Sequence, residues 1–76
     1  MEKETKEILN KLEGYLKFKN ISKKKLAELW KKNDAYIYRR FSGIVELTLQ
    51  DIRDLCKILQ LTKEEAIDIF FYNKLT

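Results

Sequence analysis

The sequence predicts an all-α protein made of five short helices. Between helix-breaking positions, every segment carries apolar residues at the three- and four-residue spacing of an amphipathic helix, and none alternates as a strand does. The 76 residues include no proline, and 45% are hydrophobic while 37% are charged, as in a folded globular chain. A chain of this length buries only about 60% of its unfolded surface, so we expect one small core and a single domain, residues 1–76.

Capping residues indicate where each helix begins and ends. We expect helices at residues 4–19, 23–30, 34–41, 49–59 and 63–71. The expected N-caps of the last four are Ser22, Asn33 or Asp34, Thr48, and Thr62. Oxygens of these side chains can accept hydrogen bonds from the open amides of a first turn. Asn20 and Gly43 suit the left-handed conformation that ends a helix.

The apolar residues at helical spacing define the expected core. In the first three helices they are Ile8, Leu9, Leu12, Leu16, Leu26, Ala27, Trp30, Ile37 and Phe41. In the last two they are Leu49, Ile52, Leu55, Cys56, Leu59, Ala66, Ile67, Ile69, Phe70 and Phe71. Side chains three and four residues apart lie on one face of a helix, so each set is expected to face inward.

The cysteine and histidine content limits the kinds of covalent, metal and catalytic site that the chain can form. Cys56 is the single cysteine and the chain has no histidine. An intramolecular disulfide is therefore excluded, and no zinc site or histidine-based catalysis is expected. Cys56 is interpreted as a small core residue, with a reactive thiol as the alternative. We expect no metal, no cofactor and no enzymatic activity.

Basic residues are concentrated in the middle of the chain. The net charge is +4, from 16 Lys or Arg and 12 Asp or Glu. Residues 17–40 hold nine basic residues against Glu28 and Asp34, whereas residues 44–76 hold four basic and six acidic ones. A modest positive charge also serves solubility, but its concentration in residues 17–40 indicates a nucleic-acid partner for that segment.

Residues 21–43, ISKKKLAELWKKNDAYIYRRFSG, carry two of the expected helices joined by a tight turn. Ala27 is small where two helices must cross closely, and the apolar residues on both helices face inward. The polar remainder of the second helix, Asp34, Tyr36, Tyr38 and Arg39, is then left facing outward. This pattern predicts a helix-turn-helix, in which the second helix can enter a DNA major groove while the first crosses the backbone.

The first turn of the helix at 23–30 is unusual, because Lys23, Lys24 and Lys25 fill it. The helix dipole already presents about half a positive charge there, so each lysine costs a few tenths of a kcal/mol. A phosphate bound at this helix start would reverse that cost. A solvated lysine run kept for solubility is the alternative.

This stretch resembles the helix-turn-helix of the phage Cro and CI repressors, the XRE-like class. It matches the family pattern I-S-x-x-x-L-A-x at 21–28 and I-x-R-x-F-x-G at 37–43, and the resemblance extends over about residues 15–72. Two residues depart from it: Lys31 stands where the family prefers a turn glycine, and Lys32 where it usually has an apolar residue. The resemblance implies a compact five-helix lambda-repressor-like domain with an extended first helix and its motif at about 22–42.

The resemblance also implies a function, namely sequence-specific binding of double-stranded DNA by a phage-type transcriptional regulator that represses by occupying an operator. By position in the motif, the residues expected to face base edges are Asp34, Ala35, Tyr38 and Arg39. Those expected at the DNA backbone are Lys23, Lys24, Lys31, Lys32, Asn33, Tyr36, Arg40 and Ser42. Two roles stay open: Asp34 either accepts from cytosine N4 or caps its helix, and Tyr36 either meets a phosphate or packs between the two helices.

A second class of function stays open, a protein-interaction module on the same fold, such as an antitoxin or a phage inhibitor. Its expected mark is an exposed apolar surface formed by Ile67, Phe70, Phe71 and Tyr72. The same residues are the expected contact of a weak homodimer assembled on DNA. No run approaches the ~20 apolar residues of a membrane span, and the first residues do not resemble a signal peptide. We therefore expect no membrane association and, by resemblance, a location in the bacterial cytoplasm or nucleoid.

Overall fold

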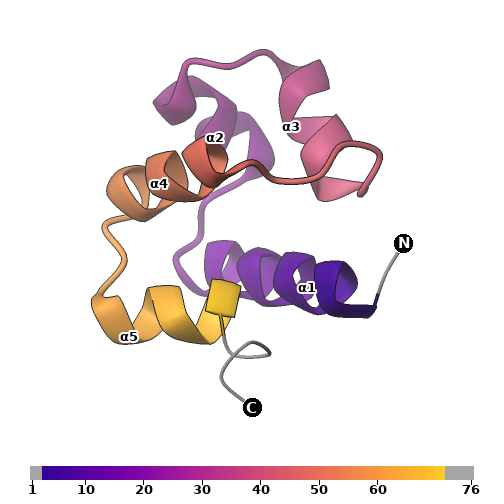
Figure 1. Ribbon diagram of the computed structural model, residues 1–76. Helices are drawn as coiled ribbons and strands as arrows, with labels where there is room; N and C mark the ends of the chain where they lie inside the picture. The colour runs from indigo at the N-terminus through magenta and orange to yellow at the C-terminus, as the bar shows by residue number, and fades with distance from the viewer. Residues whose placement is uncertain (1–2, 72–76) are drawn as a thin grey trace. The chain divides into compact units, whose positions relative to one another are not determined.

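The computed structural model describes residues 3–71 and is all-α over that range (Figure 1). Its elements in chain order are α1 (Lys3–Phe18), α2 (Lys23–Trp30), α3 (Asp34–Phe41), α4 (Leu49–Ile58), α5 (Lys63–Ala66) and the π-helix η1 (Ile67–Phe71). Backbone contacts divide the chain into two compact units, Met1–Glu46 and Leu47–Thr76. The five predicted helices are thus present.

The predicted caps account for the helix starts. The Lys25 amide donates to Ser22 Oγ over 3.0 Å, which caps α2. Thr48 and Thr62 each form a reciprocal capping box with the acid three residues on. Asn20 (φ 59°) and Gly43 (φ 84°) adopt the left-handed conformation expected of them.

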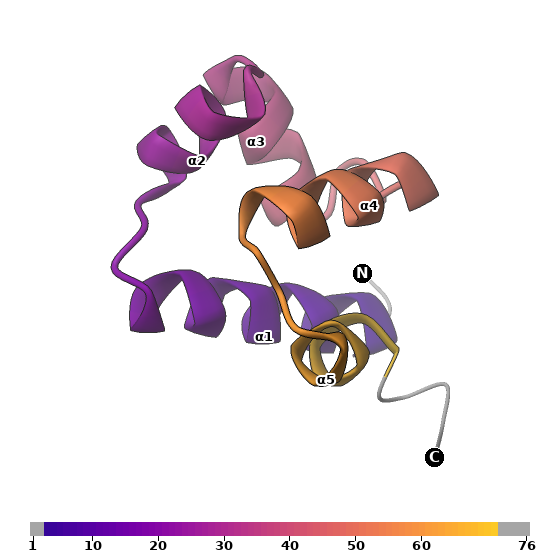
Figure 2. The same cartoon turned by 90° about the vertical axis from the view of Figure 1, so that its left-hand side faces the viewer.

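The first unit contains α1, α2 and α3, and α2 lies against α3 in both views (Figures 1 and 2). Its buried apolar residues are Leu9, Leu12, Leu16, Leu26, Ala27, Trp30, Ile37 and Phe41. This confirms the inward faces predicted for α2 and α3. The predicted face of α1 is confirmed at its three leucines, while Ile8 is half-buried.

In the second unit the inward face of α4 differs from the prediction. Leu55 and Leu59 are buried, but Leu49 is 60% exposed and Cys56 is half-buried. At 100° per residue, Leu49 lies about 120° around the helix from Leu55, so it cannot share a face centred there. The residue that does share it is Asp51, 1% exposed, whose carboxylate accepts from the Thr48 amide at 2.9 Å.

The last helix also differs from the prediction, because the segment 63–71 is not one α-helix. Only Lys63–Ala66 is α-helical, and Ile67–Phe71 continues as a π-helix. A π-helix uses i→i+5 hydrogen bonds. Four of the five residues in this segment are apolar, so their spacing in the sequence does not show whether the helix uses i→i+5 or i→i+4 hydrogen bonds.

Candidate nucleic-acid interface

The start of α2 presents three lysines to solvent. Burial of Leu26, Ala27 and Trp30 fixes the orientation of the helix. Lys23, Lys24 and Lys25 are consequently exposed. They form what we call the first-turn lysines.

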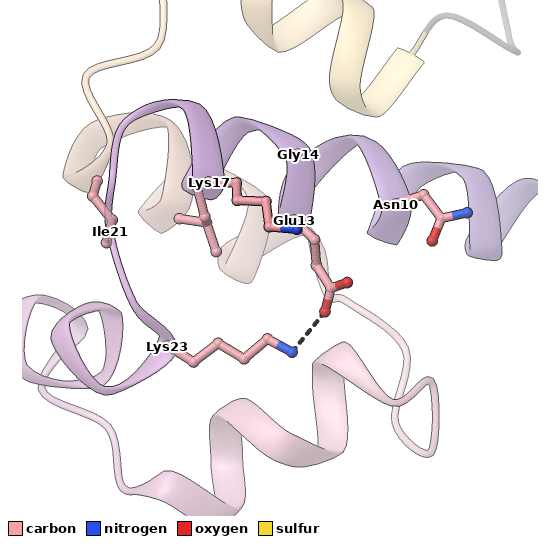
Figure 3. A pocket seen from close by; sticks show the side chains of 7 residues that line it. Asn10, Glu13, Gly14, Lys17, Ile21 and Lys23 are labelled. Carbon is pink, nitrogen blue, oxygen red and sulfur yellow. Dashed lines mark ion pairs between the residues drawn. The ribbon is translucent and has the colours of Figure 1, made fainter.

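Two of the first-turn lysines already contact an acidic side chain. Lys23 Nζ lies 2.6 Å from Glu13 Oε1 on α1, and Figure 3 shows the two side chains extending toward each other. The same ammonium lies 5.2 Å from the centroid of the Phe41 ring on α3. Lys25 Nζ lies 4.0 Å from Glu28 Oε2, within the same helix. Lys23 therefore links all three helices of the first unit.

A hollow of about 450 Å³ lies beside the Glu13–Lys23 pair. Its lining residues are Asn10, Glu13, Gly14, Leu16, Lys17, Ile21 and Lys23. Two lysines and a glutamate are among these residues, and Figure 3 shows the Glu13–Lys23 ion pair joining α1 to α2.

The turn between α2 and α3 is closed by a lysine in a left-handed conformation. Lys31 has φ 58° and ψ 40°, and the Lys32 amide donates to the Ala27 carbonyl over 3.1 Å. Glycine is the usual residue for such a helix end because it has no Cβ to clash. Lys31 therefore adopts the backbone conformation of a turn glycine, at some cost in strain.

Asn33 is the cap of α3. Its Oδ1 accepts from the Tyr36 amide at 2.8 Å. The interpretation of Asp34 as the cap is therefore wrong: Asp34 is the first residue of the helix, exposed, where the dipole favours its charge. The Nδ2 amide of Asn33 is not used in this cap and can donate to another group.

The outer side of α3 carries all four residues predicted to face base edges. Asp34, Ala35, Tyr38 and Arg39 are exposed, Tyr38 to 65%. The structure therefore places them together on one surface of a helix whose opposite side is anchored in the core by Ile37.

A second hollow, of about 390 Å³, joins α3 to the start of α2. It is lined by Lys23, Lys24, Asp34, Ile37, Tyr38, Phe41 and Ser42. Two residues predicted to face bases and three predicted to meet the backbone thus surround one concave surface. Ser42 is engaged there, since its hydroxyl donates to the Arg39 carbonyl over 3.3 Å.

Tyr36 packs between the two helices, as one of its two open roles requires. Its ring meets the Trp30 ring edge-on, with centroids 5.3 Å apart. Lys32 Nζ lies 4.8 Å from the Tyr36 centroid and Arg40 Cζ lies 3.7 Å from it. We call Lys32 and Arg40 the ring-held cations.

Sequence reasoning missed both sets of cation partners. The Glu13–Lys23 pair joins residues in different helices, and no local spacing signals it. The Tyr36–Arg40 contact has the four-residue spacing at which side chains on one helix meet, so this contact could have been predicted from the sequence. The Lys32–Tyr36 contact could not, because a turn separates the two residues.

The surface predicted for a homodimer or a protein partner is smaller than expected. Phe70 is 4% exposed and Ile67 is half-buried. Phe71 is 40% exposed, and Tyr72 lies outside the described residues. Of the predicted set, Phe71 alone among the described residues offers substantial apolar area.

Residues 3–71 contain one cysteine, Cys56, and no histidine. No three His, Cys, Asp or Glu side chains in that range come close enough together to hold a metal ion. No helix in that range has the length and apolar character needed to span a bilayer. Burial raises the pKa of the Cys56 thiol, which keeps it protonated and poorly nucleophilic.

No protein-family model, curated protein or solved structure matches the chain significantly. The resemblance to the phage repressors is therefore carried by the motif residues quoted above, and it stays a prediction.

Proposed function

We propose that the chain binds double-stranded DNA in a sequence-specific manner and acts as a small repressor-type regulator by occupying an operator. The observation that carries the proposal is the outer side of α3, where Asp34, Ala35, Tyr38 and Arg39 are all exposed beside a basic α2. A short helix with a polar outer side and a buried inner side, preceded by a second helix and a tight turn, is the arrangement that reads a major groove.

The side chains on α3 suit particular base edges. The planar fork of Arg39 can pair with guanine O6 and N7. Ala35 can contact a thymine methyl group, as can an edge of Tyr38. Since Asn33 provides the cap, the Asp34 carboxylate is left to accept from cytosine N4.

The charge of the motif supports attraction to the DNA backbone. Residues 17–40 hold nine basic residues against two acidic ones. Lys23 and Lys24 line a hollow together with Asp34 and Tyr38, and residues 31–33 form the turn that leads into α3. Contacts of this kind position a protein on DNA and determine the salt dependence of binding, without reading sequence.

A salt-titrated mobility shift on the native upstream DNA and on random duplex tests the proposal. Arg39→Ala should weaken specific binding by about 1–3 kcal/mol and leave random-duplex binding nearly unchanged. Arg53→Ala is the matched control, because Arg53 is also exposed but lies on α4 outside the motif. Equal losses on both DNAs would make Arg39 a phosphate contact, and absence of any salt-dependent binding would overturn the proposal.

The proposed homodimer would form on DNA, with two α3 helices about 34 Å apart on adjacent half-sites. Among the described residues its contact is reduced to Phe71, so the dimer should be weak. Analytical ultracentrifugation with a two-half-site duplex should give two chains per duplex, and Phe71→Ala should lower that ratio. The alternative function as a protein-interaction module relied on the same surface and has less support for the same reason.

A further inference from the structure

Gly14 lies in the interior of α1, where a glycine lowers the stability of the helix. Glycine is less favourable there than alanine because it gives up more backbone freedom on folding. A Cβ added to Gly14 would meet no other part of the described chain within 4 Å, so no neighbouring group requires its absence. Packing within residues 3–71 therefore gives no reason for a glycine at this exposed position.

Gly14 also forms part of the wall of the hollow between α1 and α2. Asn10, Gly14 and Lys17 follow one another along α1 at the spacing of one helix face, and Lys23 lies opposite them on α2 (Figure 3). At Gly14 no side chain stands between the helix backbone and the hollow. A glycine in a concave surface is what a close approach of a binding partner to the backbone requires.

The charge of this hollow favours an anionic partner. Two lysines, Lys17 and Lys23, line it against one acid, Glu13. Because Glu13 Oε1 lies 2.6 Å from Lys23 Nζ, those two charges offset each other in the free protein. The exposed Lys17 then supplies the excess positive charge. The side-chain amide of Asn10 adds hydrogen-bond donors on the same side of α1.

Lys23 connects this hollow to the outer side of α3. It lines both the hollow between α1 and α2 and the hollow that contains Asp34 and Tyr38, two of the residues predicted to face bases. All of these residues belong to the first unit. A chain of phosphates that lies beside α3 and reaches Lys23 is therefore already at the edge of the hollow on α1. This continuity favours the same polyanion as the occupant of both surfaces.

We propose that the exposed side of α1 around Gly14 is a second contact with the DNA sugar-phosphate backbone. Gly14 lets the strand approach the helix closely, while Lys17 and Asn10 bind a phosphate beside it. This inference rests on the proposed function and extends the interface from the helix-turn-helix to the helix that precedes it. The stability that the glycine costs in the free protein is offset by closer contact in the complex.

Gly14→Ala distinguishes this role from a structural one, because stability and DNA binding should change in opposite directions. Alanine fits the free protein without a clash, so Tm should rise by several degrees. Its methyl group occupies the place of the strand, so binding to random duplex should weaken about fivefold, and Gly14→Leu should weaken it roughly twentyfold. Thermal melts and fluorescence anisotropy measure the two effects. A higher Tm with unchanged binding in both variants would overturn the inference.

Lys17→Gln tests the phosphate contact in the same hollow. It should lower the salt slope by about 0.9 and weaken binding to random duplex about fivefold near physiological salt. Lys6→Gln is the matched control, because Lys6 is also an exposed lysine of α1 but lies roughly 16 Å along the helix from Lys17 and outside the hollow. Its loss should stay below about twofold. Equal losses from the two variants would indicate general charge attraction and would overturn the inference.

Amide chemical shifts of the wild-type protein identify the occupant without any variant. Adding random duplex should shift the Gly14 and Lys17 amides together with those of α3. Shifts at α3 alone would confine the DNA to the helix-turn-helix and overturn the inference. Shifts at Gly14 with inorganic phosphate but not with duplex would assign the hollow to a small anion and also overturn it. A wild-type protein that shows no salt-dependent binding to any duplex would instead overturn the proposed function, and this contact with it.

Discussion

The first-turn lysines and the ring-held cations belong to the same helix-turn-helix but are held by different partners. At the start of α2, Lys23 lies 2.6 Å from Glu13 and Lys25 lies 4.0 Å from Glu28. Beyond the end of α2, the Tyr36 ring holds Lys32 at 4.8 Å and Arg40 at 3.7 Å. Lys23 and Lys25 thus have acidic partners, while Lys32 and Arg40 share contact with one aromatic ring.

This difference changes what each group offers to a phosphate. A lysine paired with an acid must leave its partner before it binds an anion, and the acid then repels the anion. An aromatic ring that contacts a cation carries no net charge, so the ring itself does not repel an incoming anion. Counting positive residues therefore overstates the contribution of Lys23 and Lys25 to phosphate binding.

The largest difference in DNA affinity is expected between two double variants, each of which removes two positive charges from one of the groups. Lys32→Gln/Arg40→Gln should reduce binding to every DNA sequence by about 2 kcal/mol near physiological salt, since each lost phosphate contact releases about 0.9 fewer counterions. The salt slope should fall by about 1.8. Lys23→Gln/Lys25→Gln removes the same charge and should lose less than half as much affinity. Salt-titrated fluorescence anisotropy on random duplex measures both.

Thermal melts of the free proteins control this experiment. Lys23→Gln/Lys25→Gln removes two like charges from the positive end of the α2 dipole but also two exposed ion pairs, so its stability should change by less than about 1 kcal/mol. If the first-turn pair lost as much affinity as the ring-held pair, the acidic partners would not be limiting and the comparison would fail.

Arg40→Lys tests the geometry of the ring contact without changing charge. A guanidinium stacks flat on an aromatic face and forms two parallel hydrogen bonds to a phosphate, whereas an ammonium does neither. We expect a loss of about 1 kcal/mol in binding to random duplex, with an unchanged salt slope. Arg39→Lys is the comparison variant on the outer side of α3. It should weaken binding to specific DNA more than binding to random duplex. If Arg40→Lys bound DNA as tightly as the wild type, Arg40 would contribute only its positive charge and not its planar geometry.

Glu13→Gln should act in the opposite direction. It releases Lys23 from its ion pair, so DNA binding should strengthen by up to about fivefold, which corresponds to the 0.2–1 kcal/mol of an exposed pair. The salt slope should rise toward one further contact, about 0.9. Glu28→Gln is the matched control, because its 4.0 Å pair with Lys25 is longer and its release should matter less. Equal gains from both variants would indicate general charge attraction rather than release of Lys23.

The helix boundaries could be predicted from sequence because they depend on local chemistry. Ser22, Thr48 and Thr62 satisfy amides three residues away, and Gly43 terminates its helix through its own backbone freedom. Leu49 was misassigned because helical spacing shows which residues share a face, not which of two overlapping apolar faces turns inward.

The candidate interface was predictable only as a set of exposed residues. The resemblance placed Asp34, Ala35, Tyr38 and Arg39 on one face of α3, and all four are exposed. It could not supply the partners of the cations. Those partners depend on how α1, α2 and α3 pack, and residue type alone does not distinguish a lysine paired with Glu13 from one held over Tyr36.

Lys31→Gly should have the smallest effect on DNA binding and a clear effect on stability. Lys31 is left-handed, with φ 58°, and a glycine removes the Cβ clash of that conformation. Part of the gain is offset because glycine is freer in the unfolded chain, so we expect a net stabilisation of about 0.5–1 kcal/mol and a rise in Tm of several degrees.

Lys32→Gly is the matched control for that variant, since it removes the same charge from the adjacent position. Lys32 has no left-handed strain to relieve, so glycine there should lower stability by up to about 1 kcal/mol. It also removes a ring-held cation, so binding to random duplex should fall by about 1 kcal/mol, while Lys31→Gly should lose less. Chemical denaturation and anisotropy on the same two proteins would separate the effects. If both variants weakened binding equally, Tyr36 would give Lys32 no advantage over its neighbour, and the distinction between the two groups of cations would rest on the acids alone.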